Sequence, residues 1–189
     1  MKEKIIISGA GLCGSLLGTI LAIKNQDVTI YERRGDLRKN KTERGRSINL
    51  ALSIRGIEAL KLAGIEDEVK EISIPMYGRG IHMPDGSFQT FPYSGRAGEY
   101  INSISRTDLN AALMNAFERI RPGEIHFSHT TEQVDFESNK ITLRSYDDNQ
   151  IKNEKFGYLF GTDGANSAVR KSLFEKSHFS YTYSQQFLD

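Results

Sequence analysis

The chain has 189 residues, of which 38% are hydrophobic and 26% are charged, and its formal net charge is +1. This composition is typical of a globular domain, and the near-neutral charge argues against bulk attraction to nucleic acid. The sequence contains no apolar run near the roughly 18 residues of a membrane span, and it enters a predicted strand without a signal peptide, so we expect a cytoplasmic protein. The single cysteine, Cys13, excludes an internal disulfide framework, and we interpret it as a small packed side chain.

The beginning of the chain has the pattern strand, glycine turn, helix, strand and acid. A β-branched run at residues 5–7 precedes the sequence GAGLCG at residues 9–14. A helical apolar pattern covers residues 12–23, and a second predicted strand at residues 28–31 ends on Glu32. This order is the dinucleotide-binding fingerprint in its expected context, and the alternative is a glycine-rich turn in another βαβ unit.

Each glycine of the fingerprint has a physical reason to be glycine. Gly9 permits the tight turn, Gly11 lets the backbone approach a pyrophosphate, and Gly14 allows close packing of helix and strand. The phosphates would lie at the N-terminus of the helix, where unpaired N–H groups and the helix dipole favour anions. We expect Glu32 to accept hydrogen bonds from a ribose.

The middle of the chain begins with a basic run at residues 33–46. Such a run forms either a solvated loop or a surface that faces cofactor phosphates, for which Arg33 is the best single candidate. Further along, we predict helices at residues 53–63 and 66–70, and short strands with a hairpin at residues 72–89.

A strong helix is predicted to begin near Ser105, which has capping-box spacing to Asp108, and to stop before Pro122. A strand at residues 125–129 and an antiparallel meander follow. His126 and His129 lack the register of a metal site, so we interpret them as ordinary strand residues and predict no metal.

A second motif occupies residues 158–170, with the sequence YLFGTDGANSAVR. An apolar strand ends at Gly161, a turn follows at Asp163-Gly164, and a helix begins near Ser167. At the carboxyl end of a strand, Asp163 is placed to reach a ligand that crosses the sheet edge. The alternative is one more capped turn between a strand and a helix.

The two motifs together resemble those of the FAD-dependent aromatic hydroxylases, also called group A flavoprotein monooxygenases, whose later motif is the DG motif. Within that family, the chain is similar to the subgroup that acts on L-kynurenine. Four stretches carry this similarity: residues 45–53 with 55–56, residues 79–82, residues 100–106 with 109–110, and residues 183–187.

The resemblance implies a set of ligand-binding residues. Arg79 and Tyr93 match the arginine and tyrosine that bind the amino-acid carboxylate of kynurenine, and a guanidinium fork with a phenol donor suits a carboxylate. The positions that match contacts to FAD are Gly9, Gly11, Gly14, Glu32, Arg33, Ala51, Arg106 and Asp163.

The resemblance also implies a fold and an extent. We expect an α/β, Rossmann-like FAD-binding domain with a mostly parallel sheet and an added antiparallel meander. Residues 1–189 would form its N-terminal part, and residues 71–104 would contribute to the substrate-binding layer. The family's later Gly-Asp-Ala-Ala-His element has no counterpart here. We therefore expect a truncated chain that lacks most of the substrate domain and is inactive by itself.

The implied reaction is 3-hydroxylation of L-kynurenine with FAD, NADPH and O₂. The aniline nitrogen already activates the ring carbon, so we assign no catalytic acid or base; the protein orients the ring and excludes water. The alternatives are a related flavin hydroxylase of another aromatic acid and a non-catalytic FAD-binding module. The sequence leaves the oligomeric state open.

Overall fold

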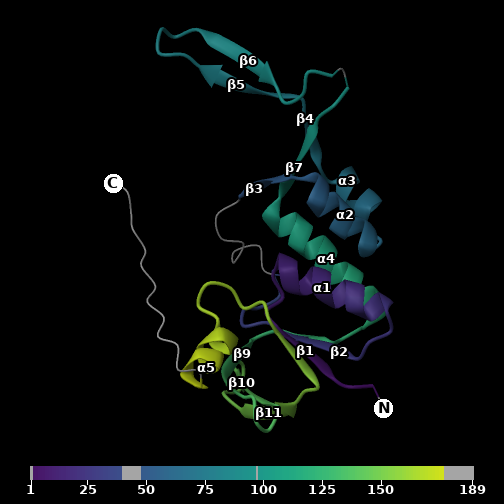
Figure 1. Cartoon of the computed structure of the whole chain (residues 1–189), viewed down its shortest axis with the longest axis vertical. Coiled ribbons are helices and arrows are strands. Elements are labelled where there is room, and N and C mark those ends of the chain that lie inside the picture. The colour runs from purple at the N-terminus through teal and green to yellow at the C-terminus, as the bar shows by residue number, and fades with distance from the viewer. Residues whose placement is uncertain (1, 40–47, 97, 177–189) are drawn as a thin grey trace. The chain divides into compact units, whose positions relative to one another are not determined.

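The computed structural model describes residues 2–39, 48–96 and 98–176 (Figure 1). The chain divides into two compact units: Met1–Gly14, Gln26–Gly35 and Gly123–Asp189 form the first, and Ser15–Asn25 and Asp36–Pro122 form the second. Basic residues between 40 and 47, and the family-like stretch at 183–187, lie outside the described residues. No described helix is long and apolar enough to cross a membrane.

The first unit is built on a parallel sheet with the order β12-β1-β2-β8. Its strands are β12 (Tyr158–Gly161), β1 (Ile5–Ser8), β2 (Val28–Tyr31) and β8 (Ile125–His126). Every residue of β1 and β2 is buried, as expected for β-branched and aromatic strands at the centre of a parallel sheet. The sequence-based prediction of a Rossmann-like sheet is therefore confirmed.

An antiparallel meander completes the first unit, and it also confirms the prediction. Its order is β11-β10-β9, with β9 at His129–Asp135, β10 at Lys140–Ser145 and β11 at Ile151–Lys155. Helix α5 (Ala168–Lys176) packs against β9. The core beneath the meander consists of Ile6, Tyr31, Val134, Ile141, Leu143 and Phe156.

The predicted strand at residues 125–129 is wrong in its extent. Strand β8 ends at His126, because Ser128 adopts a left-handed conformation with φ of 58° and turns the chain into β9. A left-handed backbone conformation is uncommon for serine, so the sequence does not predict a turn at this residue.

The second unit contains a small antiparallel sheet and several helices. Strand β7 (Ile101–Ser105) pairs with β3 (Asn49–Leu52) on one side and β4 (Ile74–Met76) on the other. The helices are α2 (Ile54–Leu62), α3 (Glu66–Glu71) and α4 (Arg106–Ile120), together with most of α1 (Leu12–Ile23). Ser53 and Ser105 cap α2 and α4 by accepting hydrogen bonds from Gly56 and Asp108 backbone N–H groups.

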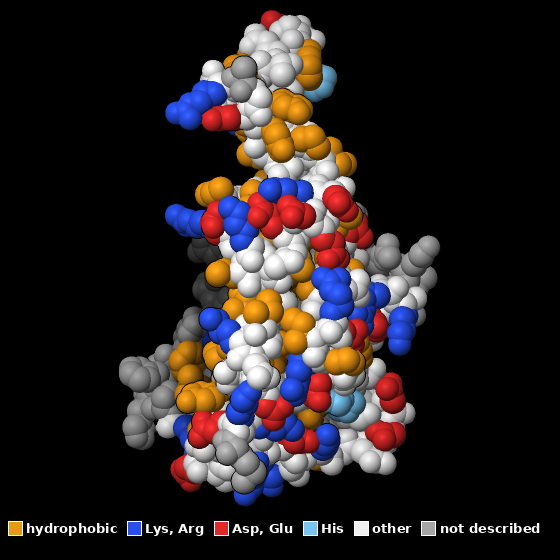
Figure 2. All heavy atoms as spheres, turned by 90° about the vertical axis from the view of Figure 1, so that its right-hand side faces the viewer, with side chains coloured by type: hydrophobic (Ala, Val, Ile, Leu, Met, Phe, Trp, Pro, Cys, Tyr) orange, Lys and Arg blue, Asp and Glu red, His pale blue; other side chains and the backbone are white. Residues whose placement is uncertain are grey.

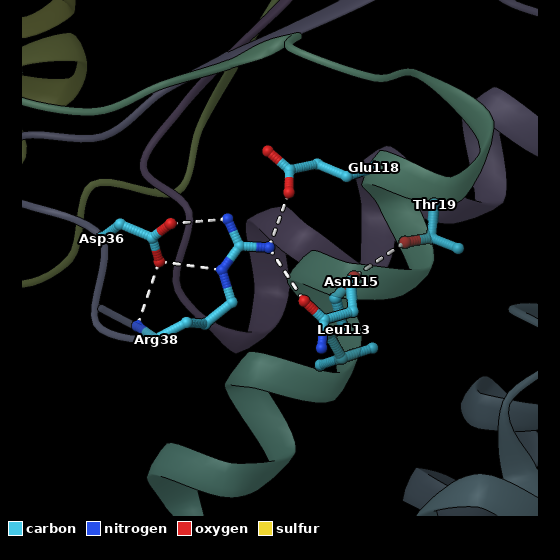
Figure 3. Close-up of polar contacts among 6 residues, drawn as sticks. All are labelled: Thr19, Asp36, Arg38, Leu113, Asn115 and Glu118. Carbon is cyan, nitrogen blue, oxygen red and sulfur yellow. Dashed lines mark hydrogen bonds and ion pairs between the residues drawn. The ribbon is translucent and has the colours of Figure 1, made fainter. Parts of the chain in front are cut away.

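Within the second unit, a polar network joins Asp36 and Arg38, at the start of the segment Asp36–Pro122, to helix α4 (Figure 3). Both carboxylate oxygens of Asp36 accept from the guanidinium of Arg38, at 2.8 Å each. The same guanidinium donates to Glu118 at 2.7 Å and to Asn115 at 2.9 Å. Burial raises the pKa of Asp36, but hydrogen bonds and charge from Arg38 outweigh it, so the pKa lies below its ordinary 3.8.

The second unit also carries a two-stranded hairpin, formed by β5 (Gly78–His82) and β6 (Phe88–Pro92). All five residues of β6 are exposed. In Figure 2, hydrophobic side chains gather on the upper part of the molecule, where β4 to β7 lie. The exposed apolar residues on and beside these strands include Ile74, Tyr77, Phe88, Phe91, Tyr93 and Tyr100.

Candidate functional site

The glycine turn after β1 is shaped by contacts that leave no room for side chains at two of its three glycines. Gly9 has a φ of +103°, and a Cβ there would lie 2.6 Å from the carbonyl oxygen of Thr162. A Cβ on Gly14 would lie 1.9 Å from the carbonyl oxygen of Gly9. Around Gly11, by contrast, a Cβ would meet nothing within 4 Å. The turn is thus closed on the protein side and open at Gly11, where a ligand can approach the backbone.

Glu32 follows β2 and presents a buried carboxylate, with 6% of the residue exposed. Its Oε2 accepts from the backbone N–H of Ala10, within the glycine turn, at 2.8 Å. Its Oε1 accepts from the backbone N–H and the Nε of Arg34, at 2.9 Å and 3.1 Å. The acid and the glycine turn are therefore one connected structure.

The backbone around Glu32 is held by the corner between β8 and β9. The N–H of Glu32 donates to His126 at 2.9 Å, and the N–H of His129 donates to the carbonyl of Glu32 at 2.8 Å. The N–H of Ser128 donates to the carbonyl of Arg34 at 3.1 Å. Sequence reasoning treated these residues as ordinary strand, and it missed that they fix the position of the acid.

Arg33 was the basic residue expected near the cofactor, and the structure places its side chain in solvent. The arginine that contacts Glu32 is Arg34, which sequence reasoning did not select. The spacing carries a signal, because a residue two positions after an acid can return its backbone N–H to the carboxylate in a local turn. The role of Arg33 toward a cofactor stays a prediction.

The second motif meets the glycine turn through Thr162. Its hydroxyl lies 2.8 Å from the carbonyl oxygen of Gly9 and 2.9 Å from that of Ser8. Sequence reasoning also missed this residue, although a hydroxyl at the end of a strand beside a glycine turn is a suitable donor for exposed carbonyl groups.

Asp163 directs both carboxylate oxygens at its own loop and at helix α5. Oδ1 accepts from the Ser167 hydroxyl at 2.5 Å, and Oδ2 accepts from the backbone N–H groups of Ala168 and Val169 at 2.7 Å and 3.3 Å. The side chain therefore caps the helix, as the alternative reading of the motif proposed. Both oxygens of the carboxylate are therefore engaged in hydrogen bonds within the protein, and contact of Asp163 with a cofactor stays a prediction.

The residues of the first unit fit a dinucleotide cofactor. The opening at Gly11 admits phosphate, the N-terminus of α1 favours an anion, and the acceptor at Glu32 suits a ribose hydroxyl. Cys13 lies in the first turn of this helix and is exposed, which corrects the expectation of a packed side chain. The position points outward because the packed face of this turn is taken by Gly14, which is buried.

The predicted substrate residues Arg79 and Tyr93 project from one face of the hairpin. Arg79 lies opposite Phe91 in the ladder, and Tyr93 follows Phe91 by two residues along the same chain segment. The N–H of Tyr93 donates to the carbonyl of Tyr77 at 3.0 Å, which continues the pairing. Because side chains alternate along a strand, these four residues share one face.

That face combines a cation with aromatic rings. The rings of Tyr77 and Tyr100 lie 5.4 Å apart in a tilted arrangement. Arg79 and Tyr93 are both exposed, and 44% of the surface of Tyr93 is accessible to solvent. An arginine that shares a sheet face with phenols is suited to an aromatic molecule with a carboxylate.

Two further predicted cofactor residues lie in the second unit, one on its small sheet and one at the start of α4. Ala51 is exposed in β3 and pairs with Ser103 of β7. Arg106 is the first residue of α4, is exposed, and donates its backbone N–H to Ile48 at 2.9 Å. The β3–β7 ladder therefore brings Ala51 near the start of α4, and the contact of Ala51 and Arg106 with FAD stays a prediction.

Comparison with known proteins gives the family. A model described as an FAD-binding domain matches residues 2–189. The chain belongs to this family of FAD-binding domains. The FAD-binding domain is 40% identical over 184 residues to kynurenine 3-monooxygenase of Myxococcus xanthus strain DK1622, covering 97% of the chain and 40% of that protein. It is 42% identical over 187 residues to kynurenine 3-monooxygenase of Sus scrofa, covering 99% of the chain and 39% of that protein.

Solved structures agree on the fold. The tetrameric form of 2-methyl-3-hydroxypyridine-5-carboxylic acid oxygenase matches with a TM-score of 0.71 at 22% identity, covering 91% of this chain and 42% of that one. The flavin-dependent monooxygenase PieE, solved with FAD and substrate, matches with a TM-score of 0.75 at 17% identity, covering 92% and 32%. The chain thus spans about 40% of the length of these two kynurenine 3-monooxygenases.

Proposed function

We propose that the polypeptide carrying this chain is a flavin-dependent monooxygenase that converts L-kynurenine to its 3-hydroxy product with NADPH and O₂. The observation that carries the proposal is the identity of about 40% to kynurenine 3-monooxygenases along nearly the whole chain. The connected glycine turn and acid, and the arginine-phenol face of the hairpin, support it physically.

The residues of the first unit would hold the adenosine end of FAD. Glu32 accepts from the ribose, the backbone at Gly11 and the start of α1 face the pyrophosphate, and Asp163 keeps the neighbouring turn in place. Arg33, Ala51 and Arg106 are the further contacts that we assign to FAD. Bound FAD supplies the redox chemistry and the activation of oxygen.

The hairpin and its neighbours, residues 71–104, would contribute to the substrate-binding layer. The guanidinium of Arg79 pairs with the amino-acid carboxylate of kynurenine, and the phenol of Tyr93 donates one more hydrogen bond to it. The protein needs no strong base, since the aniline nitrogen already activates the ring carbon. Its task is to orient the ring and exclude water, because a wet site wastes reducing equivalents.

The test is turnover by the polypeptide that carries this chain. We expect FAD, NADPH, O₂ and L-kynurenine to give 3-hydroxykynurenine, detected by chromatography, with NADPH oxidation that depends on substrate. A parallel assay with other aromatic acids, such as 4-hydroxybenzoate, distinguishes a related hydroxylase. Turnover of another acid and not of kynurenine would overturn the substrate assignment while leaving the flavin chemistry in place.

For the 189-residue chain by itself, we propose FAD binding at most, without hydroxylation. The supporting observation is that the chain spans about 40% of the length of its relatives. A pocket made by part of an enzyme leaves the reacting centre open to water. Visible flavin absorbance in the purified chain measures binding, and formation of 3-hydroxykynurenine at the rate of the relatives would contradict the proposal.

A further inference from the structure

The carboxylate of Glu32 is held on both of its oxygens before any ligand arrives. Oε2 accepts one hydrogen bond, from Ala10, and Oε1 accepts two, from the backbone N–H and the Nε of Arg34. An ionised carboxylate offers about four lone-pair sites. Three are used, and the remaining one is on Oε2.

Arg34 is itself held in place by the chain. Its carbonyl accepts from the N–H of Ser128, the residue with a φ of 58° at the corner between β8 and β9. The N–H of His129 fixes the carbonyl of Glu32 in the same corner. The backbone on both sides of the Glu32–Arg34 pair is thus held by hydrogen bonds, which limits where the two side chains can lie.

Exposure separates the roles of the two partners. The side chain of Glu32 is 8% exposed, whereas that of Arg34 is 62% exposed. An ion pair with so exposed a partner adds little to the stability of the fold. Its effect is on the orientation of the buried acid, because a bond from Nε fixes the terminal torsion of the glutamate.

We propose that Arg34 is a positioning residue for the cofactor site, which orients Glu32 so that Oε2 is presented to the ribose. The proposal rests on the proposed function, in which Glu32 is the ribose acceptor of FAD. Without the Arg34 side chain, the carboxylate keeps its two backbone donors but loses the third, from Nε, so its terminal torsion is less restricted and FAD binding must fix it. The expected loss is about three- to tenfold in affinity, the usual cost of ordering one such side chain.

A double-mutant cycle on the polypeptide that carries this chain tests the proposal. The four proteins are the wild type, Arg34→Met, Glu32→Ala and the double variant, and the readout is the FAD Kd from quenching of flavin fluorescence. We expect Glu32→Ala to weaken FAD at least tenfold, as about 1.5–3 kcal/mol is typical of a charged hydrogen bond. In the Glu32→Ala background, Arg34→Met should then change nothing, because no carboxylate is left to orient.

The outcomes separate the two claims. Unchanged affinity in Glu32→Ala would overturn the FAD site itself. Two results would overturn the positioning role alone. In the first, Glu32→Ala weakens FAD binding but Arg34→Met binds FAD as the wild type does. In the second, Arg34→Met raises the FAD Kd by the same factor with and without Glu32. Arg34→Lys should give an intermediate loss, since it keeps a charged side-chain donor, unlike Arg34→Met, but not the planar guanidinium. As a matched control, Arg144→Met removes the Arg144–Glu132 pair of the meander and should leave FAD affinity unchanged.

Discussion

The hydroxyl of Thr162 lies 2.8 Å from the carbonyl oxygen of Gly9, although 153 positions separate the two residues. It also lies 2.9 Å from the carbonyl oxygen of Ser8, so one proton serves two acceptors at the end of β1. Through this contact the DG motif closes against the glycine turn. The two motifs that indicated the family in the sequence are therefore joined physically within the first unit.

Replacing Thr162 tests how much this contact contributes. Thr162→Val keeps the shape of the side chain but removes the hydroxyl that donates to the Gly9 carbonyl and shares the Ser8 carbonyl with the backbone N–H of Thr162, so we expect the free energy of unfolding to fall by about 1–2 kcal/mol. Thr162→Ser keeps the hydroxyl and should lose less than Thr162→Val. Urea denaturation followed by circular dichroism measures both, and equal stability of Thr162→Val and wild type would contradict the prediction.

Alanine at Gly14 and at Gly11 should have opposite consequences. At Gly14 the methyl would lie 1.9 Å from a backbone oxygen, so the start of α1 must move, and we expect unfolding to become easier by about 2–3 kcal/mol. At Gly11 the methyl meets nothing within 4 Å, so stability should be kept, but it would stand where we propose that the pyrophosphate approaches, and FAD should bind more weakly. Urea midpoints and FAD titration of both variants check this, and a stable Gly14→Ala would show that the turn adapts.

The elements that the sequence predicts well are those with strong local signals. Residues 5–7 and 28–31 are β-branched and aromatic runs beside a glycine turn, and they form the parallel core as expected. Ser53 and Ser105 cap their helices where capping chemistry places them. In these segments, local preference and tertiary packing favour the same structure.

The sequence does not predict side-chain contacts that depend on the course of the backbone. Arg33 and Arg34 are chemically identical neighbours, and only the turn after β2 decides which of them reaches Glu32. The left-handed Ser128 that holds this turn has no signature, since glycine or asparagine is the usual residue there. Cys13 is exposed for a similar reason, because helix position and not residue type decides which side chains are packed.

The Asp36–Arg38 pair predicts a pH dependence of stability. The pKa of Asp36 lies below its ordinary value of 3.8, so the ionised form stabilises the folded chain above about pH 3.8. That contribution is lost as the pH falls through the lower folded pKa. Arg38→Met leaves the buried carboxylate with the backbone N–H of residue 38 but without its charged partner, and should cost about 3 kcal/mol at pH 7.

The sign of the effect is checked by a pH series. Urea unfolding of wild type and Arg38→Met from pH 7 to pH 3 should show the difference between them shrinking below about pH 3.8, where Asp36 becomes protonated in the unfolded chain. Lys61→Met removes an exposed pair with Glu58 and should follow the wild type throughout. A difference between Arg38→Met and wild type that stays constant with pH would assign the effect to packing of the arginine stem.

Arg79 and Tyr93 share a hairpin face, and substitutions there test the substrate assignment. In the polypeptide that carries this chain, Arg79→Met should raise the kynurenine KM by at least a hundredfold, because losing one partner of a desolvated carboxylate pair costs about 3–5 kcal/mol. Tyr93→Phe should raise it about tenfold or less, since one neutral donor is lost. FAD content should stay at the wild-type level in both.

The matched control for these substitutions is the opposite face of the same hairpin. Thr90 lies opposite Gly80, one position out of phase with Arg79 and Phe91, so its side chain leaves the ladder on the other side. Thr90→Val keeps the shape and the strand preference, and the kynurenine KM should be that of the wild type. An unchanged KM in Arg79→Met would remove the residue from the site and with it the physical reason for an amino-acid substrate. A rise in KM for Thr90→Val equal to that for Arg79→Met would instead show that the hairpin responds as a whole, and that its face does not select the carboxylate.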